Sequence, residues 1–245
     1  MATAAQHYER HLAGIYAWSV GGIDVVLAAG RAEIEALGLP RARGELVVDL
    51  GAGFGKHAIA LARAGARVLA IDASAELSAS LRGLAKGLPV RVVTDDLLSF
   101  PRYLDEPVGA LLCMGDTLTH LATFDAVDAL CRDAWSALAP GGTLAMSFRE
   151  YSVPRTGSER FIPVRSDSDR LLTCFLEFDS QVVRVHDIVH ERTPAGWTTR
   201  VSDYPKLRLS SARVIASMER NGFTVTRDAG AGGMVQLVGA KRSAR

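Results

Sequence analysis

An acidic, glycine-rich stretch carries the residues of this chain with the clearest chemical meaning. Asp49 is followed by glycines at 51, 53 and 55, and a further acid, Asp72, closes an apolar run about twenty residues after the first glycine. Glycines allow a tight backbone turn and let a ligand lie directly on the main chain. An acid at the end of the second strand can accept hydrogen bonds from ribose hydroxyls. The pattern therefore predicts a site for a ligand that contains a ribose.

The spacing of the glycines distinguishes two classes of such ligands. A dinucleotide-binding turn, G-x-G-x-x-G, requires a third glycine at the position that Lys56 occupies. No G-K-[ST] sequence follows the glycines, which disfavours a phosphate-binding loop of the nucleoside-triphosphatase kind. A dehydrogenase is therefore the weaker interpretation.

The motif Asp49-x-Gly51-x-Gly53-x-Gly55 closely resembles motif I of the class I S-adenosylmethionine-dependent methyltransferases, and Asp72 matches the acid that binds the adenosyl ribose there. The resemblance implies S-adenosylmethionine as cofactor and S-adenosylhomocysteine as product. It implies that the glycines lie under the cofactor and that Asp49 reaches its ammonium group, directly or through water. Asp72 also suits a helix N-cap, and both roles can coexist. The implied contacts are Asp49, Gly51, Ala52, Gly53, Gly55, Asp72 and Ala73.

Two acids, Asp95 and Asp96, follow the third expected strand. In the methyltransferases that this chain resembles, an acid here accepts a hydrogen bond from the adenine amino group, and the next backbone N–H binds a ring nitrogen. The resemblance favours Asp96 with Leu97, because the family usually places a small or apolar residue after the acid. Asp95 is the alternative, and two solvated turn acids are the plainer interpretation.

The segment from Leu111 to Leu121 ends the fourth expected strand, where open α/β sheets bind their ligands. It is similar to the G-N-S-x-x-H-L segment of glycine N-methyltransferase-type enzymes, with Asp116 in place of the asparagine. The resemblance implies that Met114 packs on the cofactor. The ordinary pKa of histidine suits a general base near neutrality, so His120 is the candidate base and Asp116 its alternative. The other interpretation of His120 is a structural one, as a cap or a partner of a backbone carbonyl.

The fifth expected strand ends in Ser-Phe-Arg-Glu-Tyr, and glycine N-methyltransferases carry H-R-N-Y there. Arg149 and Tyr151 match that segment, whose arginine binds the substrate carboxylate, whereas Phe148 and Glu150 depart from it. A planar guanidinium can bind two oxygens of a carboxylate or phosphate at once. Arg149 is therefore the candidate substrate anchor, and an ion pair with Glu150 or another acid is the alternative. The departures leave glycine itself in doubt as the substrate.

Aromatic residues in the N-terminal segment predict a lid over the site. Tyr8, Tyr16 and Trp18 lie in an expected helix, and such helices often close over the cofactor in the small-molecule branch of the family. Tyr16 is the candidate cofactor contact and Trp18 the candidate substrate contact, because aromatic rings exclude water and attract a sulfonium cation. Plain helix packing is the alternative.

Two histidines at even spacing, His186 and His190, share one face of an expected strand. His186 is a candidate for the substrate pocket, and exposure to solvent is the alternative. A metal site is not expected, because no third ligand follows at a suggestive spacing.

Composition excludes several other classes. The 245 residues carry a formal charge of +1 with no basic stripe, so nucleic acid is not an expected partner. The apolar segments fall short of a membrane span, and the N-terminus has no signal-peptide pattern. Cys113, Cys131 and Cys174 are widely spaced, which suits buried thiols in a reducing compartment and predicts a cytoplasmic protein. A homodimer remains open.

The order of the expected elements predicts an α/β fold, a doubly wound, seven-stranded Rossmann-like methyltransferase sheet. A helical N-terminal cap is expected over 1–43, a cofactor-binding core over 44–150, an antiparallel β insertion over 151–209, and a last helix with two core strands over 210–245. Core strands are expected near 46–50, 67–71, 90–94, 108–114 and 143–148, and helices near 57–64, 75–85 and 123–138. The insertion is expected to have three strands, near 170–178, 182–191 and 197–209, and Pro140-Gly141-Gly142 is expected to turn into the fifth core strand.

The sequence thus predicts a methyltransferase that acts on a nitrogen or oxygen atom of a small, possibly anionic, acceptor. The insertion and the N-terminal cap would enclose the acceptor from two sides, which disfavours macromolecular substrates. The absence of an Asn/Asp-Pro-Pro-Tyr segment after the fourth strand disfavours methylation of nucleic-acid bases. Resemblance to the glycine N-methyltransferases favours nitrogen slightly. The rival hypothesis is a non-catalytic protein that binds S-adenosylmethionine or activates a partner.

Overall fold

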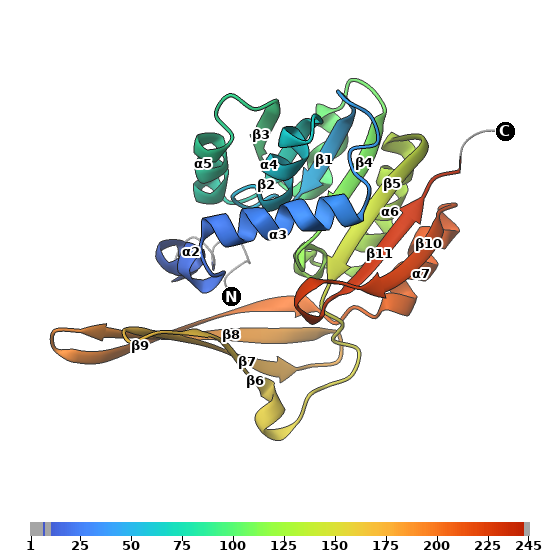
Figure 1. Ribbon diagram of the computed structural model, residues 1–245. Helices are drawn as coiled ribbons and strands as arrows, with labels where there is room; N and C mark the ends of the chain where they lie inside the picture. The colour runs from blue at the N-terminus through green and yellow to red at the C-terminus, as the bar shows by residue number, and fades with distance from the viewer. Residues whose placement is uncertain (1–6, 8–10, 243–245) are drawn as a thin grey trace.

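The computed structural model describes His7 and residues 11–242, which form two β-sheets and the helices around them (Figure 1). The larger sheet has seven strands in the order β10-β11-β5-β4-β1-β2-β3. Its strands are β1 (Leu46–Leu50), β2 (Arg67–Asp72), β3 (Val90–Thr94), β4 (Val108–Cys113), β5 (Leu138–Phe148), β10 (Thr224–Ala229) and β11 (Val235–Ala240). This arrangement confirms the predicted Rossmann-like methyltransferase sheet.

The strand pairings explain why the central strands are almost entirely apolar. β1 pairs in parallel with both β2 and β4, and β11 pairs antiparallel with β5 and β10. Helices cover both faces, so each central strand is buried on both sides. Val47 faces one helical layer and Val48 the other, because side chains alternate along a strand.

Each face of the large sheet has its own helical layer. The α helices are α2 (Tyr16–Ser19), α3 (Ile23–Ala36), α4 (Lys56–Arg63), α5 (Ala75–Leu84), α6 (Phe124–Ala137) and α7 (Ser211–Arg220). Apolar side chains of α3, α4 and α5 pack on one face, and those of α6 and α7 pack on the other. Short 3₁₀ helices are η2 (Ala13–Ile15), η3 (Leu97–Tyr103), η4 (Thr117–His120), η5 (Gly157–Arg160) and η6 (Ala231–Gly233). None of the helices in the described part of the chain is long and apolar enough to cross a membrane.

The second sheet is the predicted insertion, but it has four strands and not three. Its order is β6-β7-β8-β9, formed by β6 (Phe161–Ser166), β7 (Arg170–Phe178), β8 (Val182–Thr193) and β9 (Gly196–Leu207). The first of these strands was not predicted, because most of its side chains are exposed and Pro163 interrupts it. An edge strand tolerates proline and needs no apolar alternation.

The fifth core strand also begins earlier than predicted. It starts at Leu138 and includes the Pro-Gly-Gly segment, in which Gly141 has a φ of 80°. The pairing of β4 with β5 shifts register between Val108 and Ala110, so the extra residues of β5 bulge out of the ladder. The segment therefore turns the chain within a bulged strand rather than before a regular one.

The N-terminal segment packs against the second sheet. Leu12 and Ile15 form an apolar cluster with Leu172 on β7 and Val189 on β8. The helix α3 lies within the expected N-terminal cap, whereas Tyr8 lies outside the described residues. The insertion and the N-terminal segment therefore contact each other through a shared core.

The close approach of α3 to α4 gives a stability prediction. A Cβ atom at Gly30 would lie 2.1 Å from the Lys56 carbonyl oxygen, which is a backbone atom and cannot swing away. We expect Gly30→Ala to lower the free energy of unfolding by about 1–3 kcal/mol, measured by urea denaturation. Gly83→Ala is the control, because its Cβ would meet nothing within 4 Å in the part of the chain that the structure describes, and alanine favours a helix over glycine by about 0.5–1 kcal/mol. Equal effects of the two substitutions would contradict this packing argument.

Candidate active site

The three motif glycines lie between β1 and α4, and they serve different purposes. A Cβ atom at Gly51 would lie 2.3 Å from the Thr117 methyl group, and one at Gly55 would lie 2.2 Å from Leu81. Gly53 has a φ of 56°, and no heavy atom of the described residues lies within 4 Å of its Cβ position. Gly51 and Gly55 are therefore required by packing, whereas Gly53 leaves open space above the loop, as a ligand-bearing turn must.

Asp72 holds this loop from the neighbouring strand. Its Oδ2 accepts a hydrogen bond of 2.7 Å from the Gly53 N–H, and its Oδ1 accepts one of 2.8 Å from Ser74 N–H. Burial raises the pKa of Asp72, although both hydrogen bonds oppose that rise. The side chain that caps α5 belongs to Ser74, which accepts from Leu77 N–H, and not to Asp72. Each carboxylate oxygen of Asp72 retains a second lone pair, so ribose hydroxyls can still bind it.

Asp49 is a buried carboxylate with an unsatisfied oxygen. Its side chain is 1% exposed, and among the described residues its Oδ2 has no hydrogen-bond partner. Burial raises its pKa, while the nearby His57 opposes the rise. A buried acceptor without a donor costs about 1–3 kcal/mol, so the site calls for a donor group. Together with the open space over Gly53, this oxygen fits the ammonium-bearing ligand that the sequence motif implies.

The two acids after β3 have different partners. Asp95 accepts hydrogen bonds from the Tyr103 hydroxyl at 2.6 Å and from Asp96 N–H at 2.8 Å. Asp96 caps η3 through its Oδ1, which accepts from Leu98 N–H at 2.8 Å, and the side chain is exposed. Asp95 is thus committed to the protein, and Asp96 is the more accessible of the two acids.

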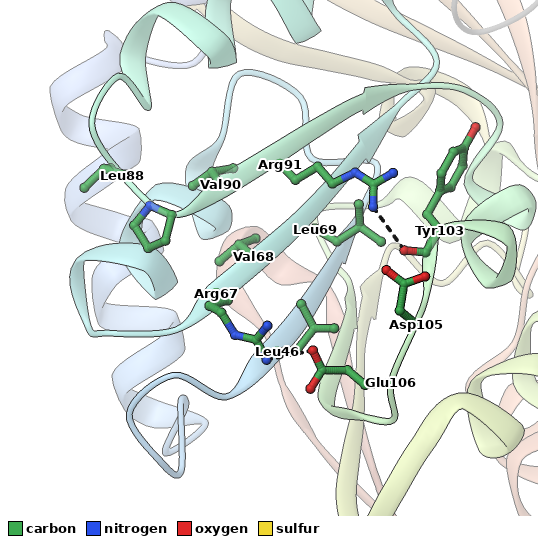
Figure 2. Close-up of a pocket in the computed structure, with 11 residues that line it drawn as sticks. Leu46, Arg67, Val68, Leu69, Leu88, Val90, Arg91, Tyr103, Asp105 and Glu106 are labelled. Carbon is green, nitrogen blue, oxygen red and sulfur yellow. Dashed lines mark hydrogen bonds and ion pairs between the residues drawn. The ribbon is translucent and has the colours of Figure 1, made fainter.

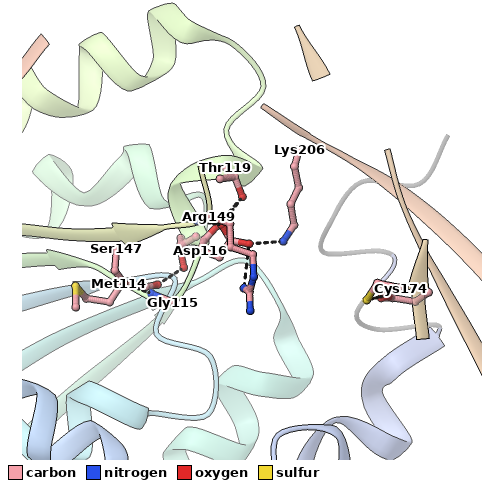
Figure 3. A network of polar contacts seen from close by, with 10 residues as sticks. Met114, Gly115, Asp116, Thr119, Ser147, Arg149, Cys174 and Lys206 are labelled. Atoms are coloured by element: carbon pink, nitrogen blue, oxygen red, sulfur yellow. Dashed lines mark hydrogen bonds and ion pairs between the residues drawn. The ribbon is translucent and has the colours of Figure 1, made fainter. Parts of the chain in front are cut away.

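The loop after β4 is fixed by Asp116, which has a left-handed backbone with a φ of 77°. Its Oδ1 accepts hydrogen bonds from Arg149 N–H at 2.9 Å and from the Thr119 hydroxyl at 3.2 Å. Its own N–H donates to the Ser147 carbonyl oxygen at 3.0 Å. Asp116 therefore ties the ends of β4 and β5 together, as Figure 3 shows.

A lysine from the second sheet completes this network. Lys206 on β9 donates from Nζ to Asp116 Oδ2 at 2.6 Å, and Arg149 Nη1 lies 3.6 Å from the same oxygen (Figure 3). Burial opposes the charge on both members of the Asp116–Lys206 pair. Their attraction outweighs that penalty, so the pKa of Asp116 is lowered and that of Lys206 raised. The sequence did not reveal Lys206, because nothing in a strand pattern indicates which distant loop a lysine will reach.

His120 has a pKa far from the expected range. Burial and then the charge of Lys206 lower it to about 3, against a smaller opposing effect of Asp116. Its ring stacks on the ring of Tyr204 with centroids 5.6 Å apart. These surroundings favour the neutral imidazole of His120 and oppose the titration near neutrality that was expected from the sequence.

The two lid aromatics occupy different places. Tyr16 is half-buried, and its ring meets that of Phe54 in the glycine loop edge-on at 5.7 Å. Burial and the neighbouring Asp72 raise the pKa of Tyr16, which places this side chain at the cofactor loop. Trp18 instead donates from Nε1 to Asp167 Oδ2 at 2.6 Å, between β6 and β7. Trp18 thus joins the N-terminal segment to the insertion.

The insertion presents a different set of side chains to the site than predicted. His186 lies on the outer face of β8 with His190, and its Nε2 contacts Glu177 Oε2 at 2.5 Å. This placement corrects the prediction that His186 lines the substrate pocket. Its neighbour Asp187 is on the buried face, where His7 Nε2 lies 2.7 Å from Oδ2 and the Cys174 thiol donates to Oδ1.

The remaining predicted residues lie as follows. Tyr151 is 5% exposed and packs edge-on against Phe178, at a centroid distance of 6.2 Å. Met114 is buried, and its carbonyl oxygen accepts from the Thr117 hydroxyl. Ala52 is buried, Leu97 is half-buried and Ala73 is exposed.

A groove of about 410 Å³ lies away from all of these residues (Figure 2). It is formed where β1, β2 and β3 begin, and an ion pair of 2.9 Å between Arg67 and Glu106 crosses it. Ligand sites of open α/β sheets lie at the opposite, carboxyl edge. The groove is therefore separate from the candidate active site.

Comparison with known proteins agrees with this geometry. Residues 47–142 match the family model of a methyltransferase domain. The glycine/sarcosine N-methyltransferase of Aphanothece halophytica is 29% identical over 109 residues, which cover 44% of this chain and 41% of that protein. The chain therefore matches about two fifths of the length of this curated relative.

Two solved structures share nearly the whole fold. The amino pentose methyltransferase of Micromonospora echinaspora, solved with bound S-adenosylmethionine, has a TM-score of 0.75 at 17% identity and covers 94% of this chain and 97% of its own. The sugar N-methyltransferase of Streptoalloteichus has a TM-score of 0.70 at 16% identity, with 89% and 88% covered. Family model, curated relative, fold and glycine loop agree on S-adenosylmethionine as the cofactor. Residues 47–142 of this chain match a methyltransferase domain, and the chain has the fold of S-adenosylmethionine-dependent methyltransferases.

Proposed function

We propose that this chain methylates an amine nitrogen of a small acceptor that also carries an acidic group. The single observation behind this proposal is that the two candidate bases of the loop after β4, His120 and Asp116, both have lowered pKa values. Neither candidate base there titrates near neutrality, because the pKa of His120 is lowered to about 3 and that of Asp116 is also lowered. The site is thus better suited to an acceptor whose nucleophilic atom needs no protein base to remove its proton before attack.

The chemistry distinguishes nitrogen from oxygen. When bound, S-adenosylmethionine supplies a methyl group that is already electrophilic, because it is attached to a positively charged sulfur. A neutral amine has a lone pair ready to form the nitrogen–carbon bond as the carbon–sulfur bond breaks, and its proton can leave to water afterwards. An alcohol requires removal of its proton during attack, which calls for a base of suitable pKa. Weak bases at His120 and Asp116 therefore favour an amine.

The cofactor side of the site is assigned on the motif and the contacts described above. We assign Asp72 to the ribose, Asp49 to the ammonium group, and Asp96 with the Leu97 N–H to the adenine. The glycine loop, Ala52, Ala73, Met114 and Tyr16 complete this side. The role of these residues is to hold the methyl group in line with the acceptor, since orientation can lower a barrier by up to about 7–11 kcal/mol.

Arg149 is the proposed anchor for the acidic group of the acceptor. Its side chain is 44% exposed, so the guanidinium faces solvent rather than the core. Its distance of 3.6 Å from Asp116 is too long for a strong hydrogen bond, which leaves the planar fork available to a carboxylate or phosphate. The alternative partner, Glu150, accepts instead from Ser211 N–H at 2.9 Å.

The names of the similar proteins support nitrogen as the target. The curated relative is a glycine/sarcosine N-methyltransferase, and the structural relatives are an amino pentose methyltransferase and a sugar N-methyltransferase. Their acceptors include both amino acids and amino sugars. We therefore propose a panel of glycine, sarcosine and phosphorylated amino sugars as the first acceptors to screen.

The anchor predicts a specific kinetic defect. We expect Arg149→Met to raise KM for an acidic amine by about tenfold or more, because a charge-assisted hydrogen bond contributes roughly 1.5–3 kcal/mol. The affinity for S-adenosylhomocysteine should stay within about twofold. Arg102→Met, at an exposed position of η3, is the matched control and should change neither quantity. An unchanged KM in Arg149→Met would exclude Arg149 as the anchor.

A further inference from the structure

Lys206 is a buried cation that reaches the site from the second sheet. Its side chain is 8% exposed, and its Nζ lies 2.6 Å from Asp116 Oδ2 and 5.6 Å from the centre of the Tyr204 ring. On β9 it shares a face with Ser202 and Tyr204, which are paired with the buried face of β8. This face lies against the loop after β4, where the acceptor is proposed to bind.

Charged and titratable groups surround this ammonium from every element that packs near it. Those of the large sheet are Asp116 and His120 after β4 and Arg149 and Tyr151 after β5. Those of the second sheet and the N-terminal segment are Cys174, Asp187, Tyr204, Tyr16 and His7. Arg149 and Lys206 both approach the carboxylate of Asp116, whereas the other acid, Asp187, is held by His7 and Cys174, so Asp116 itself faces two cations.

We propose that Lys206 is a specificity-determining residue, whose buried positive charge excludes protonated amines and other organic cations from the acceptor site. This inference rests on the proposed amine acceptor and extends it to the charge of the reacting group. An ammonium ion next to Lys206 would meet a like charge in a poorly solvated place, which is unfavourable. A neutral amine meets no such penalty, and it is the form with a free lone pair. Lys206 therefore selects the protonation state of the acceptor amine that is able to react.

The same contact predicts a gain of binding when the lysine is lost. Asp116 would keep its carboxylate at the site, with Arg149 only 3.6 Å away as a loose partner. A small organic cation could then take the place of the lysine ammonium. The ring of His120 would also feel less positive charge, since Lys206 acts with burial to hold its pKa at about 3.

The experiment uses the full chain loaded with S-adenosylhomocysteine and needs no acceptor. NMR titration of the His120 ring is recorded for wild type, Lys206→Met and Lys206→Arg. Calorimetry with methylammonium measures cation binding in the same proteins. Lys241→Met is the matched control, because this half-buried lysine donates to the carbonyl oxygens of Trp135 and Leu138, at the edge of the large sheet where β5 begins.

We expect the His120 pKa to rise by about one unit or more in Lys206→Met and to stay low in Lys206→Arg and Lys241→Met. We expect only Lys206→Met to bind methylammonium. Asp116→Asn/Lys206→Met is the second variant, because it leaves no lone buried charge that prevents folding. In it, methylammonium binding should be absent, and the His120 pKa should rise less than in Lys206→Met, because the lost Asp116 carboxylate acts to raise that pKa.

The outcomes separate this inference from the proposed function. A His120 titration in Lys206→Met that matches wild type, or methylammonium binding by wild type or by Asp116→Asn/Lys206→Met, would overturn the role of Lys206. Failure to find an acceptor would count against the proposed function alone, since neither readout depends on methyl transfer.

Discussion

Replacing Asp72 with alanine is expected to weaken the binding of S-adenosylhomocysteine by about a hundredfold or more. Two hydrogen bonds from ribose hydroxyls to a carboxylate contribute roughly 1.5–3 kcal/mol each. The alanine also removes the acceptor for Gly53 N–H, so the turn under the cofactor loses its fixed position. Calorimetric titration of the two proteins measures the effect.

Two further variants make the Asp72 result specific. Asp72→Asn keeps one acceptor oxygen and should lose less affinity than the alanine variant. Asp105→Ala removes an exposed acid in the loop before β4 and should bind as wild type does. If Asp72→Ala bound S-adenosylhomocysteine with unchanged affinity, the ribose would have to lie elsewhere.

Glu33→Gln is expected to lower the free energy of unfolding at pH 7 by roughly 2–3 kcal/mol. Glu33 on α3 accepts from Lys56 Nζ at 2.5 Å and lies 2.8 Å from His57 Nε2, at the start of α4. Burial opposes its ionisation, but the hydrogen bonds from His57 and Lys56 outweigh burial and lower its pKa from 4.5 to about 2. A carboxylate whose pKa is depressed on folding stabilises the folded state while it is ionised.

The pH dependence of stability tests the same contact. The contribution of Glu33 is complete above its unfolded pKa of 4.5 and is lost as the pH falls from there through about 2. Urea unfolding at a series of pH values should therefore show a shallower acid loss in Glu33→Gln than in wild type. Glu35→Gln is the control, because Glu35 pairs with Arg31 on the exposed face of the same helix. Parallel acid losses in wild type and Glu33→Gln would contradict the assignment.

Much of the large sheet could be predicted from local patterns. β1, β2 and β3 are short, largely apolar runs followed by turns. The helices α4 and α5 begin and end within one residue of the predicted bounds. β6 could not be predicted in this way, since an exposed edge strand has neither a buried face nor an alternating pattern. Its place is set by pairing with β7, and sequence periodicity does not contain that information.

The sequence alone indicates how the residues proposed for the cofactor come together, whereas it indicates only part of the surroundings proposed for the acceptor. Asp49, the glycines and Asp72 lie close together in sequence, so one βαβ unit brings them together. Lys206 and Asp187 come from strands that meet the core only through the tertiary fold. On β8, apolar residues occur on both faces, so alternation alone could not tell whether His186 or Asp187 points inward.

The chemical state of a residue was harder to predict than its position. The loop after β4 was placed at the site from its sequence, but the pKa of His120 depends on burial and on Lys206, which is 86 residues further along the chain. The same limit applies to Trp18, whose indole N–H donates to Asp167 on the insertion. Residue type indicates what a side chain is able to do, and the surrounding charges decide what it does.

The most direct test of the central claim is transfer of a labelled methyl group. The chain is incubated with S-adenosylmethionine labelled in its methyl carbon and with glycine, sarcosine and phosphorylated amino sugars, and the products are analysed by mass spectrometry and NMR. We predict that S-adenosylhomocysteine forms only when an acidic amine is present and that the label appears on its nitrogen. Label on an oxygen atom would contradict the proposed acceptor class, and tight cofactor binding without transfer to any acceptor would favour a non-catalytic, partner-activating protein.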